Sequence, residues 1–159
     1  MKFLKIFLLS VFLLSVFSCG SDDDICLGGE ATPRLKMKFK TKATGKLKTL
    51  DSLFINVDYG NGPVQVIAAR AKTDSVLIPL RVDDYPFTKM YVGLSRKAVT
   101  SEIKINYTTK SSYVSPACGI KKVYENVTPV LEVPAAVVDI EQNQTQILDE
   151  SKTHFYLLF

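Results

Sequence analysis

The sequence predicts an all-β fold, an antiparallel sandwich of two sheets with an immunoglobulin-like outline; a small β-barrel is the alternative. Apolar and polar residues alternate with a period of two after residue 31, and few apolar residues recur at helical spacing. About eight such segments follow one another at roughly 10 to 15 residues. Gly, Pro, Asn, Asp and Ser separate them, as in a protein built from short strands and turns.

The first three predicted strands cover residues 35–40, 53–59 and 64–69. In 35–40, Leu, Met and Phe alternate with lysines, the pattern of a strand with one buried face. Residues 53–59 alternate in the same way and end at Gly60-Asn61-Gly62-Pro63, a strong turn signal. The short apolar run 64–69 follows this turn as the third strand.

Three further strands are predicted before residue 110. Residues 75–82 are interrupted by Pro79, which cannot donate a backbone hydrogen bond to a neighbouring strand. We therefore expect this strand at a sheet edge or with a bulge. Residues 87–94 follow Pro86 as the next strand, and 99–108 alternate most regularly of all.

Turns and apolar runs continue to the end of the sequence. We expect a turn at 110–112, then extended residues at 113–114 and a strand at 120–127. Residues 137–141 and 153–159 close the chain. The last segment is apolar on both faces, so we expect it at the centre of a sheet.

The N-terminus predicts export. Lys2 and Lys5 precede an apolar run at 6–17, and Ser18 follows it, the layout of a secretory signal peptide over residues 1–18. This run is too short to span a bilayer core, which needs about 20 helical residues. Permanent anchoring by a transmembrane helix is therefore not expected.

The end of this segment favours lipid attachment. Val16-Phe17-Ser18-Cys19 resembles the bacterial lipobox, in which the Cys is acylated on its thiol and, after cleavage, on its new amine. The resemblance implies lipidation of Cys19, with palmitate-type chains; a plain signal peptide is the alternative. Two or more acyl chains anchor a protein stably to a membrane.

Residues 19–31 are predicted to be the lipidated Cys and an acidic tether, because adjacent carboxylates repel and keep a linker extended. Ser21, Asp22, Asp23 and Asp24 also resemble the export signal of Bacteroidetes lipoproteins. That resemblance implies a protein at the outer membrane, lipid-anchored and facing the cell exterior; the periplasmic face is the alternative.

Charge gives little support for nucleic-acid binding. The formal net charge is +4, and removal of the two signal-peptide lysines leaves +2 on residues 19–159, in which a single domain is predicted at 32–159. The remaining lysines alternate with apolar residues predicted to be buried, rather than with exposed aromatic residues that could stack on bases. We therefore expect no nucleic-acid partner.

The cysteine count predicts one disulfide. If Cys19 carries lipid, Cys26 and Cys118 remain as an even pair in an exported protein, and exported proteins fold in an oxidising compartment. Two reduced thiols are the alternative. A zinc site has little support, because the chain has a single histidine, His154, and zinc clusters need closely spaced ligands.

A basic segment covers the first predicted strand and its end. Residues 34–48 contain seven basic residues and no acid, among them Lys36, Lys38, Lys40 and Lys42. One interpretation is an edge strand whose outward lysines prevent association between sheets. The other is a basic patch that faces anionic lipid or polysaccharide.

No catalytic residues are predicted. Asp83-Asp84 and Asp149-Glu150 are adjacent carboxylates in expected turns, where solvated side chains are the simpler interpretation. His154 is interpreted as a hydrogen-bonded residue of the last strand rather than as a general base. The sequence lacks a nucleophile elbow, a phosphate loop and a paired-histidine metal motif, so we expect no enzyme, cofactor or metal.

Two short motifs resemble acceptors for O-glycosylation in exported Bacteroidetes proteins. Asp51-Ser52-Leu53 and Asp74-Ser75-Val76 both have an Asp, a Ser and then an apolar residue. The resemblance implies a sugar on Ser52 or Ser75. The alternative is that both are Asp-Ser turns that lead into strands.

Nearly all of the mature chain resembles an uncharacterised family of Bacteroidetes lipoproteins, a domain of unknown function. The lipobox, Cys26, Val114-Ser115-Pro116-Ala117-Cys118-Gly119 and a last strand with His154 carry this resemblance, together with two shorter motifs. The shorter motifs are Thr32-Pro33-Arg34-Leu35 and Ile78-Pro79-Leu80. It implies a small envelope lipoprotein without an assigned activity.

Two functions are therefore expected for a membrane-anchored sandwich. The first is a non-enzymatic interaction or structural module that binds an envelope protein or a surface glycan. The alternative is a lipoprotein that captures a ligand for uptake at an outer-membrane transporter. A deep apolar pocket with a few convergent polar groups would favour the alternative.

Overall fold

The computed structural model describes residues 31–116 and 118–159, which form nine strands and no helix. Each strand begins close to a run of alternating residues and stops at turn residues. The strands are β1 (Leu35–Lys40), β2 (Leu53–Asp58), β3 (Pro63–Arg70), β4 (Ser75–Ile78), β5 (Phe87–Gly93), β6 (Ser101–Ser115), β7 (Gly119–Val133), β8 (Asp139–Gln142) and β9 (Phe155–Leu158).

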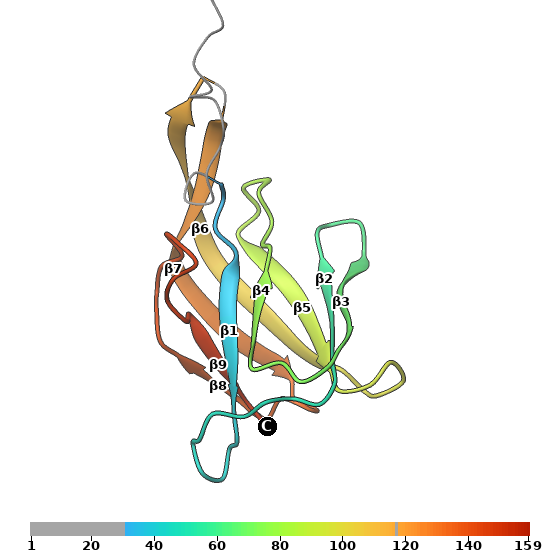
Figure 1. The fold of residues 1–159 in the computed structure, drawn as a ribbon. Helices are drawn as coiled ribbons and strands as arrows, with labels where there is room; N and C mark the ends of the chain where they lie inside the picture. Colours follow the sequence, from blue (N-terminus) through green and yellow to red (C-terminus); the bar gives the residue numbers. More distant parts are fainter. Residues whose placement is uncertain (1–30, 117) are drawn as a thin grey trace, which may run out of the picture.

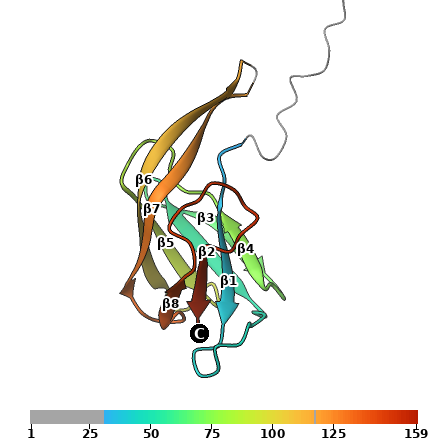
Figure 2. The same ribbon diagram turned by 90° about the vertical axis from the view of Figure 1, so that its left-hand side faces the viewer.

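These strands form two sheets (Figure 1). One sheet has the order β4-β1-β9-β8, and the other has the order β3-β2-β5-β6-β7. The two sheets lie face to face (Figure 2), and neither closes on itself in the described part of the chain. The all-β, two-sheet prediction is confirmed, and the barrel alternative is not the fold that forms.

Alternating side chains from both sheets build one core. β1 of one sheet buries every second residue, and β2, β5 and the first half of β6 do the same from the other sheet. The period-two pattern of the sequence therefore maps directly onto inward and outward faces. The largest fully buried side chains include Tyr124, Phe39, Phe155, Leu35, Met37, Leu53, Ile55, Ile78, Met90, Ile103, Ile105 and Ile147.

The pairing of β1 with β9 is parallel, whereas the sequence predicts antiparallel neighbours. Met37 lies opposite Phe155, and Lys40 lies opposite Leu158. The two strands are far apart in the sequence, so no tight turn forces them into opposite directions. β9 nevertheless lies between β1 and β8, which confirms the central position expected for the last strand.

Pro79 marks a sheet edge, as predicted. β4 stops at Ile78 and is the outermost strand of its sheet. β1 does not lie at an edge, because β4 and β9 flank it on both sides. The interpretation of its lysines as protection of an exposed edge is therefore wrong.

The expected turn at 110–112 is also wrong. β6 runs without a break to Ser115 and pairs with β7 throughout, with Ser111 opposite Lys122 and Ser112 opposite Lys121. The polar composition of this stretch imitates a turn. This stretch belongs instead to a hairpin that extends beyond the sandwich and has no core to face (Figures 1 and 2).

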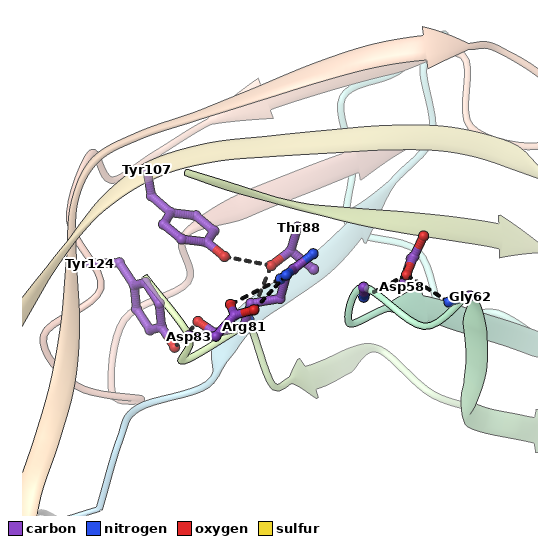
Figure 3. Close-up of polar contacts among 8 residues, drawn as sticks. Asp58, Gly62, Arg81, Asp83, Thr88, Tyr107 and Tyr124 are labelled. Atoms are coloured by element: carbon purple, nitrogen blue, oxygen red, sulfur yellow. Dashed lines mark hydrogen bonds and ion pairs between the residues drawn. The ribbon is translucent and has the colours of Figure 1, made fainter. Parts of the chain in front are cut away.

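A hydrogen-bond network fixes the connection from β4 to β5, which links the two sheets (Figure 3). The Arg81 backbone N–H donates to Thr88 Oγ1 at 3.1 Å, and the Thr88 and Tyr107 hydroxyls lie 2.7 Å apart. The Tyr124 hydroxyl donates to the Arg81 carbonyl at 3.2 Å. Burial raises the pKa of both tyrosines, so they stay neutral and can donate.

Candidate functional site

The two lateral sides of the sandwich differ. On the side of β7 and β8, Tyr124 and Ile147 form a backbone bridge, and the Gln142 side chain donates to the Val127 carbonyl at 2.5 Å. On the other side the edge strands are β3 and β4, and no pairing between them is found among the described residues. The second side is therefore open.

A cleft of about 600 Å³ occupies this open side. Its apolar wall is formed by Val66 and Ile67 of β3, Val76 and Leu77 of β4, and Pro79. Three cations, Arg34, Lys36 and Arg70, also line it. The volume lies within the range of about 300 to 1,000 Å³ that is usual for small-molecule sites.

The three cations are not equally available. Arg34 holds Glu150 with two side-chain bonds, from Nε at 2.7 Å and from Nη2 at 2.8 Å. This pair lowers the pKa of the Glu150 carboxyl. Lys36 Nζ donates to the carbonyls of Glu150 and Ser151 at 3.1 and 3.2 Å.

Arg70 is the cleft cation least engaged by other described residues. It is exposed at the end of β3, and no ion pair of Arg70 is found within the described ranges. A ligand with an anionic group would therefore meet Arg70 first, while Arg34 and Lys36 add positive potential beside it. Sequence analysis did not single out Arg70, because it lies outside the basic segment at 34–48 in the sequence. Only the fold brings it, from the other sheet, next to that segment.

Two of the four lysines of the predicted basic patch pair with acids. Lys40 Nζ lies 2.7 Å from Glu141 and 3.9 Å from the centre of the Tyr156 ring. Lys42 pairs with Asp139. Lys38 stands between Lys36 and Lys40 on the same outer face of β1. The patch is therefore a mixed surface, in which two carboxylates of β8 balance Lys40 and Lys42.

Both edges of the cleft carry features that hinder strand addition. β3 has shifts of register against β2, and Ala69 has a φ of 49°. β4 has only four residues and ends at Pro79. Bulges, short edges and proline are the usual protections against pairing with another strand. The cleft therefore fits a compact ligand better than an added strand.

His154 is buried and held by the backbone. The His154 Nδ1 accepts a hydrogen bond from the Lys36 backbone N–H at 2.9 Å, and the His154 backbone N–H donates to the Lys36 carbonyl at 2.9 Å. Burial lowers the pKa of the imidazole, which stays neutral with its proton on Nε2. This geometry agrees with the interpretation of His154 as a hydrogen-bonded residue of the last strand.

The adjacent carboxylates hold loops in place. Asp83 pairs with Arg81, and Asp84 accepts from Lys122 Nζ and Thr109 Oγ1, both at 2.6 Å. These bonds lower the pKa of both aspartates. Over residues 31–116 and 118–159 no group of three or more His, Cys, Asp or Glu side chains could hold a metal.

The remaining predicted residues fall in three places. Ser52 lies just before β2, and Ser75 begins β4, lines the cleft and donates from Oγ to Asp74 at 3.0 Å. Cys118 lies in the turn between β6 and β7. Cys19, Ser21, Asp22, Asp23, Asp24 and Cys26 lie outside the described residues, so lipidation, export and the disulfide stay predictions. The described ranges contain no helix long and apolar enough to cross a membrane.

The fold and the cleft define a β-sandwich protein with one open, positively charged side. The chain belongs to the family of unknown function DUF6452, whose model matches residues 51–159. This match covers β2 to β9 and begins after β1. It agrees with the expectation of an uncharacterised domain. Neither the curated proteins nor the solved structures contain a match to this sequence.

Proposed function

We propose that this chain is a lipid-anchored protein of the outer membrane that faces the cell exterior, and that its sandwich is a non-enzymatic binding module. The signal-like segment, Cys19 and the acids at 22–24 support the location. The cleft between β3 and β4 supports binding, because it combines an apolar wall with uncompensated positive charge.

The cleft favours ligand capture over a purely structural role. Its single most informative residue is Arg70, an exposed cation beside Val66 and Ile67 that has no acidic partner among the residues described. A ligand with an apolar chain and one carboxylate or phosphate would pack its apolar chain against the wall of the cleft and place its negative charge at Arg70. Delivery of such a ligand to an outer-membrane transporter is the role we propose.

The predicted disulfide fits the course of the chain. The Lys122 N–H donates to Thr32 Oγ1 at 2.9 Å, so the start of the described chain lies beside β7. Cys26 is six residues before Thr32, a span of at most about 20 Å. Cys118 is four residues before Lys122. A Cys26–Cys118 bond is therefore within reach.

Membrane fractionation tests the anchor. Cys19→Ala should move the protein from the membrane pellet to the soluble fraction, because it removes the acylated thiol. A variant that stays in the pellet would overturn lipidation. Protease treatment of intact cells then tests the outward face, and an uncleaved protein would place it on the periplasmic side.

Calorimetry with matched probes tests the cleft. Decanoate should bind, whereas decanol, which lacks the charge, and acetate, which lacks the chain, should bind much more weakly. Arg70→Gln should weaken decanoate binding, and Arg96→Gln, which changes an exposed loop arginine, should not. Equal binding of decanoate and decanol, or equal effects of the two variants, would contradict a site built on Arg70.

A further inference from the structure

The outer half of the β6–β7 hairpin extends beyond the sandwich as an arm (Figures 1 and 2), which we define as residues 110–115 and 118–122. None of these residues is buried. Tyr113 and Ile120 lie opposite each other in the ladder, and 68% and 66% of their surfaces are exposed. The arm thus presents a large apolar pair that the fold does not use.

Charge on the arm has one sign. It contains Lys110, Lys121 and Lys122 and no acidic residue. Lys110 Nζ lies 3.8 Å from Glu125 with 69% of its side chain exposed, and Lys122 is held by Asp84. An apolar pair flanked by lysines matches a surface that is anionic at its headgroups and apolar beneath them.

The start of the described chain lies at the same end of the molecule. Thr32 accepts the Lys122 backbone N–H at the base of the arm. Thr32 is thirteen residues after Cys19, at most about 45 Å of extended chain. A lipid on Cys19 would therefore keep the base of the arm within about 45 Å of the membrane, whereas the loop at 41–49 lies at the opposite end of the molecule (Figure 1).

We propose that the arm docks on the lipid surface beside the protein's own anchor, with Tyr113 and Ile120 at the headgroup boundary. This inference rests on the lipid anchor of the proposed function. Tyrosine suits the position because its ring is apolar and its hydroxyl can stay in water. The contact would set the orientation of the sandwich and keep its lateral cleft clear of the membrane.

The chain contains no tryptophan, so a single introduced one reports its own surroundings. The experiment uses the full lipidated chain in vesicles of phosphatidylethanolamine and phosphatidylglycerol with brominated acyl chains, which quench fluorescence on contact. Tyr113→Trp places the reporter on the arm. Leu47→Trp is the matched control, at an apolar side chain that is 64% exposed in the loop at the far end.

We expect the tryptophan at position 113 to shift to shorter wavelength and to lose most of its emission, and the one at position 47 to do neither. Equal emission of both reporters in brominated and ordinary vesicles would overturn the docked arm, and so would equal quenching of both. Intact mass separates the two proposals. An unacylated Cys19 overturns the anchor and this inference with it, whereas an acylated protein with an unquenched arm overturns this inference alone.

Discussion

The two halves of the β6–β7 hairpin share one ladder but differ in what they bury. In the near half Ile103, Ile105 and Tyr107 point into the core and are at most 5% exposed. In the arm the corresponding positions carry Ser111 and Tyr113, both exposed. Backbone pairing continues through both halves. The comparison shows that the ladder determines strand geometry, whereas apolar burial determines how much each half contributes to stability.

The predicted disulfide would make the arm contribute to stability, although the arm buries little apolar surface. A bond from Cys26 to Cys118 closes a loop of about 93 residues, for which the chain-entropy model gives a stabilisation of about 4 to 5 kcal/mol. Cys26→Ser with Cys118→Ser should therefore lower the free energy of unfolding by up to this amount, measured in urea. An unchanged midpoint, with both thiols free to alkylation in the parent protein, would show that the arm carries no cross-link.

Matched isoleucines test the comparison directly. Ile105→Ala removes a fully buried side chain from the near half and should lower the free energy of unfolding by about 2 to 5 kcal/mol. Ile120→Ala makes the same chemical change in the arm and should stay within about 0.5 kcal/mol. Similar losses from both substitutions would mean that the arm packs against something in solution.

Tyr124 lies where the two halves meet, opposite Thr109. Tyr124→Phe removes the hydroxyl that donates to the Arg81 carbonyl and should lower the free energy of unfolding by about 1 kcal/mol. Tyr113→Phe, which removes an exposed hydroxyl, is the control and should change little. Thermal unfolding measures both. No difference between them would show that the network around Arg81 does not stabilise the connection between sheets.

Acid should destabilise the packed region through the chain's single histidine. Burial holds the pKa of His154 below its usual value of 6.5, so the unfolded chain binds the proton more readily. The contribution of neutral His154 to the free energy of unfolding should be fully present above about pH 6.5. It should be lost as the pH falls from there through the pKa of His154 in the folded protein. His154→Asn keeps an acceptor for the Lys36 N–H and should flatten this part of the profile. An unchanged slope in the variant would assign the acid sensitivity to carboxylates.

The local sequence predicted where the strands lie better than it predicted which strands pair with each other. Pro79 identified an edge, because a missing N–H limits any strand that contains it. The apolar residues on both faces of the last segment identified a central strand. The error at 110–112 arose because serine and lysine occur both in turns and in strands that extend into solvent. The position of β1 could not be read from its lysines, because its partner β9 lies more than a hundred residues later.

The candidate site was even less accessible to sequence analysis. Arg34 and Lys36 belong to the predicted basic segment, but the acids that pair with Arg34 and Lys40 come from the last 20 residues of the chain. Arg70 comes from the opposite sheet. Only the meeting of β1, β3 and β4 turns these separate charges into one cleft with an apolar wall.

The sequence by itself determined the fold class, because period-two alternation assigns each residue to a buried or an outward face whatever strand lies beside it. Its N-terminal pattern also predicted the anchor. Tertiary structure alone decided sheet membership, the parallel β1–β9 pair, the open side with its cleft and the arm beyond the core. The physical reason is that alternation specifies which face is buried, whereas strand order depends on how all the strands of the described chain pack together.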